Sequence, residues 1–220
     1  MDTPIIIIGA GGHGAEVAAY ALDLGLNLLG VLDDGTPPGP WHCTRVLGGI
    51  GALPDLVREH GAVGYITAFG SNALRQKIVQ QIGALGLPRL AAARISHVSS
   101  WTGVDVEIGE GTLMAPGSLI TTRAHIGRHC ILNVKASVAH DCVVGDFCNI
   151  NPSATLCGGV VLGDGCSIGA GATVIEKCRI GAGTVIGAGA VVTTDLPAGV
   201  TAVGVPARII KELNTHFTSK

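Results

Sequence analysis

The sequence predicts a small α/β domain of the Rossmann type followed by a parallel β-helix. Two observations support this prediction. A β-branched run near the N-terminus leads through a glycine-rich turn into a helical segment, and an apolar residue stands at every sixth position from Ile108 to Val192. The expected boundaries are 1–93 for the α/β domain, 94–103 for a connector, 104–195 for the β-helix and 196–220 for a C-terminal strand and short helix.

The first segment has the pattern of a βαβ unit. Residues 5–8 predict a buried strand, and a helix is expected from about residue 14 to residue 24. Residues 28–32 predict a second strand, which ends at Asp33 and Asp34. Strands and helices that alternate in this way form a parallel sheet with helices on its faces.

A glycine motif follows the first strand. Gly9, Gly11 and Gly14 match the G-x-G-x-x-G fingerprint of dinucleotide-binding domains, which by itself predicts an oxidoreductase. About ninety residues precede the repeat, too few for two mononucleotide-binding halves. The same groups suit a nucleotide diphosphate, because N–H groups at a helix N-terminus bind phosphate and carboxylates bind a ribose or base. The alternative is that the glycines only form tight turns.

A second glycine turn is expected at the same edge of the sheet. Residues 64–69 predict a third strand, followed by the turn 70–72 and a helix that carries Arg75 and Lys77. Because the carboxyl ends of parallel strands meet at one edge, both turns should face one crevice.

The rest of the first half has less regular patterns. Residues 35–47 are rich in proline and glycine and are expected to form a loop. In this loop Trp41 and His42 either line a pocket or are buried, with burial the favoured outcome. Residues 90–95 are expected to form a connecting strand, and His97 is given no chemical role.

The second half is an unbroken hexapeptide repeat. The residue two positions before each apolar one is small almost throughout, and a glycine follows the apolar residue in every third hexad. Three hexads therefore form one coil of a triangular prism, with a short strand on each side. Five or more coils are expected, each about 4.8 Å above the last. The inward residues are Ile108, Met114, Ile120, Ile126, Leu132, Val138, Val144, Ile150, Leu156, Leu162, Ile168, Val174, Ile180, Ile186 and Val192.

The cysteines fit the repeat rather than a metal or disulfide framework. Five of the seven stand in the small-residue column, where we expect them to pack as small apolar residues. Their spacings match no zinc pattern. These five are Cys130, Cys142, Cys148, Cys166 and Cys178.

The composition indicates which kinds of partner the protein binds and in which compartment it is expected. The formal net charge is -2, so the sequence offers no electrostatic case for binding nucleic acid or an anionic membrane. Its most apolar stretch is interrupted by polar residues and glycines and is too short to span a bilayer, and we find no secretion signal. We therefore expect a cytoplasmic protein.

His140 and Asp141 are the strongest candidates for chemistry on the prism. His140 follows the inward Val138 by two residues and should lie at a corner, where Asp141 could orient its ring for use as a general base. Gly158 comes eighteen residues, or one coil, after His140. Its N–H could donate to a carbonyl oxygen, or the glycine could simply relieve strain at a corner.

His125 and His129 suggest a metal site as an alternative. The γ-class carbonic anhydrases hold zinc on a hexapeptide prism with three histidines, two of them five residues apart. Here the candidate histidines are His125, His129 and His140, which do not have that spacing. We expect no metal.

With these residues identified, the chain resembles the acetyl-CoA-dependent bacterial sugar acetyltransferases over nearly its whole length. It is most similar to the nucleotide-linked 4-amino-sugar N-acetyltransferases of the bacillosamine and perosamine types, with the sialic acid O-acetyltransferases as a neighbouring branch. The motifs that carry the resemblance are GAGGHG at 9–14, LDD at 32–34, GSNALR at 70–75, HDC at 140–142, CGG at 157–159 and VGVPAR at 203–208.

The resemblance implies a left-handed β-helix, a homotrimer with active sites between subunits, acetyl-CoA in a groove between two prisms, and a nucleotide-linked amino sugar on the N-terminal domain. It implies that His140 is the base, that Asp141 orients it, and that the Gly158 amide holds the thioester carbonyl. The cofactor-binding residues it implies are Asn149, where some relatives have histidine, Ala170, Ala188 and Arg208. The substrate-binding residues it implies are Gly11, Gly12, His13, Asp33, Asp34 and Asn72.

Three functions follow in order of preference. The first is N-acetylation of the 4-amino group of a nucleotide-linked sugar by acetyl-CoA. The second is O-acetylation of a sugar on the same scaffold, and the third is a non-catalytic trimeric scaffold that binds a nucleotide. The sequence does not decide between uridine, guanosine and thymidine nucleotides.

Overall fold

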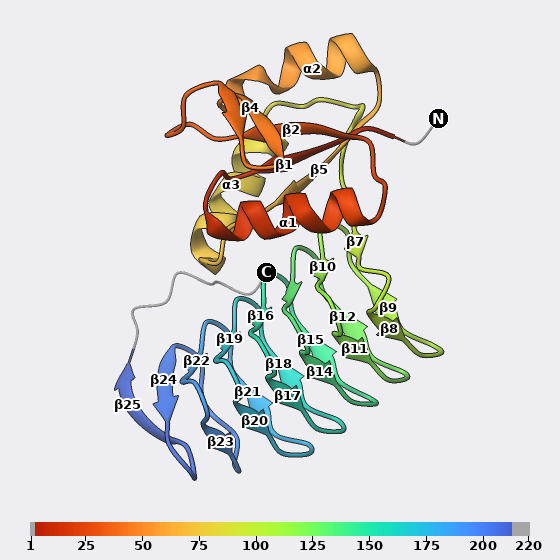
Figure 1. The fold of residues 1–220 in the computed structure, drawn as a ribbon. Helices are drawn as coiled ribbons and strands as arrows, with labels where there is room; N and C mark the ends of the chain where they lie inside the picture. The colour runs from red at the N-terminus through yellow and green to blue at the C-terminus, as the bar shows by residue number, and fades with distance from the viewer. Residues whose placement is uncertain (1–2, 213–220) are drawn as a thin grey trace. The chain divides into compact units, whose positions relative to one another are not determined.

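The computed structural model describes residues 3–212, which form two compact units that divide between Ile95 and Ser96 (Figure 1). The first unit is an α/β domain and the second is a parallel β-helix, so the predicted fold class is confirmed.

The first unit contains a six-stranded sheet with the strand order β3-β4-β2-β1-β5-β6. The central strand β1 consists of four isoleucines that are almost fully buried, and it pairs in parallel with β2 and β5. β-Branched residues suit such a strand, because both of its faces are covered. The strands are β1 (Ile5–Ile8), β2 (Leu28–Leu32), β3 (Gly39–Trp41), β4 (Thr44–Gly48), β5 (Val63–Thr67) and β6 (Leu90–Ala92).

Three α-helices pack against this sheet. Helix α1 (Gly12–Asp23) packs against β1 and β2, whereas α2 (Leu53–His60) and α3 (Asn72–Ala84) pack against β5. A single 3-10 turn, η1 (Ile50–Ala52), leads into α2. The helix that follows β1 and the helix that follows β5 therefore both begin at carboxyl ends of adjacent parallel strands, as expected from the two glycine turns.

The segment 35–47 differs from the loop that we expected. Strands β3 and β4 form an antiparallel hairpin here, in which Gly39 pairs with Val46 and Trp41 pairs with Thr44. The other edge of β4 pairs in parallel with β2. Pro40 is accommodated because β3 is at the sheet edge. His42 is exposed at the turn, where its φ is 44°, so its expected burial was wrong.

The connecting strand expected at 90–95 is also different. Residues 90–92 form β6 in the sheet of the first unit, whereas β7 (Ile95–Ser96) pairs within the β-helix. The third strand of the first unit, β5, ends at Thr67 rather than at residue 69.

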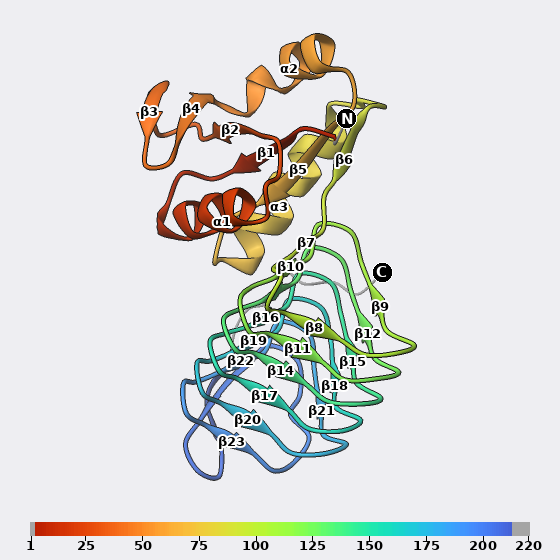
Figure 2. The same cartoon turned by 45° about the vertical axis from the view of Figure 1, so that its right-hand side comes forward.

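The β-helix has three parallel sheets, one on each side of the prism (Figures 1 and 2). The pairing register is eighteen residues through the regular coils, as in Ile120 with Val138 and Val138 with Leu156, and it shortens to sixteen where β22 pairs with β24, as in Ile186 with Ala202. One sheet holds β7, β10 (Leu113–Met114), β13 (Ile131–Leu132), β16 (Asn149–Ile150), β19 (Ser167–Ile168), β22 (Val185–Ile186), β24 (Val200–Val203) and β25 (Arg208–Glu212). The second holds β8 (Trp101–Thr102), β11 (Leu119–Ile120), β14 (Ser137–Val138), β17 (Thr155–Leu156), β20 (Thr173–Val174) and β23 (Val191–Val192). The third holds β9 (Glu107–Ile108), β12 (His125–Ile126), β15 (Val143–Val144), β18 (Val161–Leu162) and β21 (Arg179–Ile180).

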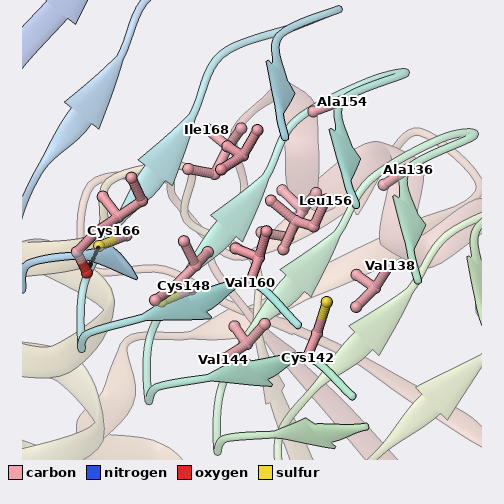
Figure 3. Packing of buried hydrophobic residues seen from close by; sticks show 14 of the residues in the cluster. Ala136, Val138, Cys142, Val144, Cys148, Ala154, Leu156, Val160, Cys166 and Ile168 are labelled. Carbon is pink, nitrogen blue, oxygen red and sulfur yellow. Dashed lines mark hydrogen bonds between the residues drawn. The ribbon is translucent and has the colours of Figure 1, made fainter. Parts of the chain in front are cut away.

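The inward residues of the repeat form the core of the second unit. All fifteen are buried except Ile108, which is partly buried in the first coil. Figure 3 shows Val138, Val144, Leu156 and Ile168 converging on the prism axis from successive coils. The period of six thus translates directly into one continuous core.

Buried thiols take part in the backbone hydrogen bonding of one corner. Sγ atoms of Cys130, Cys148 and Cys166 each donate to a glycine carbonyl fifteen residues later, at 3.1, 3.2 and 3.2 Å. Thr112 makes the equivalent bond to Gly127 with its hydroxyl, at 2.9 Å. The small-residue column is therefore both a packing and a hydrogen-bonding position.

The prism ends in an antiparallel pair. β24 continues the stack on β22, and β25 turns back on β24. The short C-terminal helix that we expected does not begin before Glu212, and residues 213–220 lie outside the described residues. Within residues 3–212 the helices are all too short or too polar to cross a membrane.

Candidate active site

His140 and Asp141 form a hydrogen-bonded pair at a corner of the prism, between β14 and β15. The chain turns here with Asp141 in the left-handed region, at φ 61°, a conformation that aspartate tolerates better than most residues. The Nδ1 atom of His140 lies 2.7 Å from Oδ2 of Asp141. Because an ionised carboxylate only accepts, Nδ1 carries the hydrogen, and in the neutral form of the ring Nε2 presents its lone pair. Both side chains are about half exposed.

Gly158 lies directly beside the His140 ring on the next coil. A Cβ atom built on Gly158 would lie 2.5 Å from Cε1 and 2.7 Å from Nε2 of His140, closer than any real side chain allows. The Gly159 N–H donates to the His140 carbonyl at 2.8 Å, which fixes the two coils in register. Within residues 3–212 the N–H of Gly158 donates to no protein acceptor. It is therefore available to a ligand beside the imidazole.

Arg123 is a third member of this group, and our sequence analysis missed it. Its Nε lies 2.7 Å from Oδ1 of Asp141 and its Nη2 lies 3.0 Å from Oδ2. Hydrogen bonds from Arg123 and then from His140 lower the pKa of Asp141 to about 2. Arg123 precedes Asp141 by eighteen residues, so the coil length could have identified it.

A pocket of about 570 Å³ adjoins this group on the earlier coils. One wall carries the exposed indole of Trp101, and Arg123 lies at its edge. Its lining consists of Trp101, Thr102, Gly103, Val104, Thr121, Thr122 and Arg123. Apolar and hydroxyl-bearing side chains thus meet next to the His140 group.

The residues suggested for the cofactor lie elsewhere on the prism. Ala170 and Ala188 are exposed at a different corner, one coil apart, where the Gly189 N–H donates to the Ala170 carbonyl at 2.8 Å. Their own N–H groups donate to no acceptor in the described part of the chain. Asn149 begins β16 on a side of the prism and is only 5% exposed, so its side chain offers little surface to a ligand in a single chain. Arg208 is exposed, and its Nη1 donates to the Ala207 carbonyl at 3.0 Å.

In the first unit, Gly11 and Gly12 begin α1 with open backbone. Gly11 is the N-cap, no side chain caps the helix, and no acidic residue stands in its first turn. A Cβ on either glycine would meet nothing within 4 Å. Gly14, by contrast, is required by close packing, because its Cβ would collide with the carbonyl oxygen of Gly9. Such an uncapped helix start can bind an anion.

His13 belongs to the same first turn. Its Nδ1 lies 3.0 Å from Oε2 of Glu16, and its side chain is mostly buried. The Nε2 atom is buried and has no hydrogen-bond partner among the described residues. The His13 ring is therefore hydrogen-bonded to Glu16 through Nδ1, and its Nε2 atom is enclosed by packing.

Asp33 and Asp34 hold loops together. Asp33 accepts from the N–H of Ala10 at 2.8 Å and from that of Gly35 at 2.9 Å, and Asp34 accepts from the N–H of Ile50 at 2.9 Å. Burial raises the pKa of Asp33, but these backbone hydrogen bonds outweigh it and the net pKa is lowered. Both carboxylates still border an apolar pocket of about 200 Å³, whose lining is Ile8, Leu32, Asp33, Asp34, Gly35, Ile50, Phe69 and Ile78.

Asn72 is oriented by a buried arginine. Arg75 is 1% exposed, and its Nη1 donates to the Phe69 carbonyl at 2.7 Å while Nη2 donates to Oδ1 of Asn72 at 3.3 Å. Arg75 thus shapes the second glycine turn from inside, and it does not present its charge to a phosphate.

His125 and His129, which suggested a metal site, have different surroundings. His125 is exposed and its Nδ1 lies 3.1 Å from Oε2 of Glu107, whereas His129 is buried and stacks on Phe147 at a ring distance of 5.2 Å. Among residues 3–212, no three His, Cys, Asp or Glu side chains gather in a metal-binding arrangement.

The α/β domain, the hexapeptide prism and the histidine at its corner define a class of protein, the hexapeptide-repeat acyltransferases. A family model described as "PglD N-terminal domain" matches residues 4–82. A second, described as "bacterial transferase hexapeptide (six repeats)", matches residues 159–194.

Solved structures similar to the whole chain specify the family. A histidine-to-alanine variant of GDP-perosamine N-acetyltransferase from Caulobacter crescentus, in complex with CoA and GDP-perosamine, is 35% identical, with 95% of this chain and 97% of that chain covered and a TM-score of 0.88. The acetyltransferase domain of PglB from Neisseria gonorrhoeae is 31% identical, with 95% and 100% covered and a TM-score of 0.87. WeeI from Acinetobacter baumannii is 30% identical, with 94% and 100% covered and a TM-score of 0.78.

The chain belongs to this family of perosamine- and PglB-type sugar acetyltransferases, and the resemblance inferred from its motifs is confirmed. The family fold is the left-handed β-helix of hexapeptide transferases. Among curated proteins, an uncharacterized protein of Acanthamoeba polyphaga mimivirus is 29% identical over 123 residues, and the match spans 56% of this chain but 23% of that protein.

Proposed function

We propose that the protein is an acetyl-CoA-dependent N-acetyltransferase that acts on the 4-amino group of a nucleotide-linked sugar. The observation that carries this proposal is the His140–Asp141 pair, packed against the bare backbone of Gly158, in a chain whose relative binds CoA and GDP-perosamine.

His140 acts as the general base. Asp141 fixes the tautomer in which Nε2 is unprotonated, so Nε2 accepts a proton from the sugar amine as its nitrogen attacks the thioester carbonyl. The new C–N bond replaces the C–S bond, and the proton held on Nε2 passes to the departing thiolate. The products are an N-acetylated sugar nucleotide and CoA.

Gly158 supplies the electrostatic part of catalysis. Its N–H has no protein acceptor, and the absence of a side chain leaves room for a carbonyl oxygen beside the imidazole. A backbone N–H directed at a developing oxyanion contributes about 3–4 kcal/mol of transition-state stabilisation in comparable sites. Base and oxyanion donor come from adjacent coils, so the coil spacing sets their separation.

The site of acetyl-CoA is proposed to lie between two chains of a homotrimer. Ala170 and Ala188 lie at a different corner of the prism from His140, so one chain alone does not gather them around one ligand. A neighbouring prism whose corner faces His140 would supply their open N–H groups for the pantetheine arm, Asn149 for a contact near the thioester and Arg208 for the phosphates.

The nucleotide-linked sugar is proposed to bind the first unit. The open start of α1 at Gly11, Gly12 and His13 suits a diphosphate. Asp33 and Asp34 border the apolar pocket at the ends of β1 and β2, and their remaining lone pairs can accept from a ribose or base. Asn72, whose amide is oriented by Arg75, completes this set. The cytoplasmic location stays a prediction from the sequence.

The test is turnover of acetyl-CoA with UDP-, GDP- and dTDP-linked 4-amino sugars, with the matching 4-hydroxy sugars as controls. We expect an alkali-stable amide product with one amino sugar and a loss of at least a hundredfold in kcat for His140→Ala, with cofactor binding retained. Acetylation that proceeds normally in this variant would exclude His140 as the base. Acetylation of the hydroxy sugars alone would favour an O-acetyltransferase, and failure to bind acetyl-CoA would favour a non-catalytic scaffold.

A further inference from the structure

Arg123 makes a two-point contact with the carboxylate that orients His140. Its Nε and Nη2 atoms lie 2.7 and 3.0 Å from the two carboxylate oxygens of Asp141, and one of these oxygens also accepts from His140. A fork of this kind fixes the plane of a carboxylate as well as its position, because two parallel hydrogen bonds leave no freedom of rotation. The orientation of the Asp141 oxygen toward His140 therefore depends on Arg123.

The coil spacing explains why these charges meet. Corner residues eighteen apart stack directly, and the five at this corner share a left-handed backbone: Asp105 at φ 56°, Arg123 at 49°, Asp141 at 61°, Gly159 at 71° and Lys177 at 63°. Asp105 also raises the pKa of Arg123, although less than Asp141 does. The guanidinium thus binds the Asp141 carboxylate and lies within electrostatic range of Asp105, next to the candidate base.

We propose that Arg123 is a positioning residue for acetyl transfer, which locks the Asp141 carboxylate against His140 and offsets the negative charge beside the imidazole. This inference rests on the proposed function of His140 as the base. It extends the His140–Asp141 pair to a triad of arginine, aspartate and histidine, whose members come from two successive coils.

The charge of Arg123 affects how readily the His140 imidazole becomes an imidazolium cation. An aspartate alone beside a histidine favours imidazolium, which has no lone pair and cannot act as a base. A guanidinium on the far side of the same carboxylate disfavours imidazolium by repulsion and by sharing the carboxylate's charge. Further titratable or charged groups stand around this corner: Asp105 acts electrostatically on Arg123, Cys142 and Cys157 flank the pair, and Glu176 and Lys177 come one coil after Gly158 and Gly159.

The chain contains a matched control for this proposal. Arg128 contacts Asp146 on the next coil with Nε at 3.1 Å and Nη2 at 2.7 Å, and its side chain is 57% exposed, the same as that of Arg123. That pair lies at another corner, and the histidine that acts electrostatically on its carboxylate is the buried His129, which stacks on Phe147 and has no proposed part in the reaction. Exposed pairs contribute little to stability, so Arg123→Gln and Arg128→Gln should unfold at nearly the same temperature as the wild type.

The experiment is the pH dependence of kcat and kcat/KM for the wild type and both variants. Arg123→Gln should lose roughly tenfold in kcat at pH 7, and the acid side of its profile should move up by about one pH unit, so that activity recovers as the pH rises. Arg128→Gln should retain the wild-type profile. Arg123→Lys keeps the positive charge but cannot make two parallel hydrogen bonds to the carboxylate. We expect it to leave the acid side of the pH profile unchanged and to lose part of kcat.

A double-mutant cycle tests whether Arg123 acts through Asp141. In the Asp141→Asn background, Arg123→Gln should change kcat less than twofold, because the carboxylate that it orients is gone. A tenfold loss that persists in this background, or a loss that is equal at every pH, would overturn the proposal and leave Arg123 with a structural or substrate-binding role.

An NMR titration of the His140 ring in the unliganded protein separates this inference from the proposed function. The Cε1 proton resonance should titrate at a higher pH in Arg123→Gln than in the wild type and Arg128→Gln, whether or not any sugar is acetylated. Unchanged titration in Arg123→Gln contradicts the inference about Arg123. Changed titration without acetyltransferase activity contradicts only the proposed function.

Discussion

The imidazole of His140 lies against the backbone of Gly158, so close that a Cβ on Gly158 would lie 2.5 Å from Cε1 of the ring. The two residues are one coil apart, and the hydrogen bond from Gly159 to the His140 carbonyl keeps them in register. This contact joins the candidate base to the candidate oxyanion donor, and it leads to the first prediction.

Gly158→Ala should displace the His140 ring and lower kcat by about a hundredfold or more, because reacting groups tolerate little displacement. The fold should remain, since the corner is exposed and the ring can move outward. Steady-state kinetics and circular dichroism check both points. Gly171→Ala, at another corner where a Cβ meets nothing within 4 Å and φ is 66°, is a stricter control, because it adds backbone strain to the prism without touching His140. Full activity in Gly158→Ala would show that the close contact has no catalytic importance.

Asp141 gives a pH-dependent contribution to stability with a defined sign. Its pKa is lowered to about 2 by the hydrogen bonds from Arg123 and His140. A carboxyl with a lowered pKa in the folded state stabilises the protein above its unfolded pKa of about 3.9, and this contribution is lost as the pH falls toward the folded pKa. The stability difference between the wild type and Asp141→Asn should therefore shrink between about pH 4 and pH 2. Urea unfolding at several pH values measures it, and a difference that widens on acidification over this range contradicts the assignment.

Asp33→Ala should destabilise the first unit by about 1–3 kcal/mol, because the N–H groups of Ala10 and Gly35 lose their partly buried acceptor. Asp55→Ala removes an exposed pair with Arg58 and should cost less than about 1 kcal/mol. Denaturant unfolding of the two variants tests the contrast. Equal stability would mean that Asp33 is not needed to hold the loops and is free for a ligand role alone.

Alkylation of the folded protein should separate the cysteines by their surroundings. Burial raises the pKa of the Cys148 thiol well above its usual range, and a protonated buried thiol is a poor nucleophile. Iodoacetamide should label the exposed Cys43 first, the half-buried Cys157 more slowly, and Cys130, Cys148 and Cys166 only after unfolding. Peptide mass spectrometry reads the order, and early labelling of Cys148 would show that the prism opens in the native state.

The repeat was predictable because each hexad carries its own information. An inward apolar residue and a small residue two positions earlier are local features, and stacking converts their period into the register of the three sheets. The hairpin at β3 and β4 was not predictable in the same way. Its proline and glycine content is typical of a loop, and only pairing of Val46 with the buried Val31 of β2 makes it part of the sheet.

The sequence alone determined the two-part architecture, the position of His140 at a corner, and the one-coil separation of Gly158 from it, because all three follow from counting in eighteens along the chain. The tertiary structure decided what the polar side chains do. Asp33 and Asp34 accept hydrogen bonds from backbone N–H groups, and Arg123 donates two hydrogen bonds to Asp141. These bonds form because the folded backbone brings the donors and acceptors within about 3 Å of each other. Spacing fixes which residues are neighbours, and only the folded geometry determines which of their atoms bond.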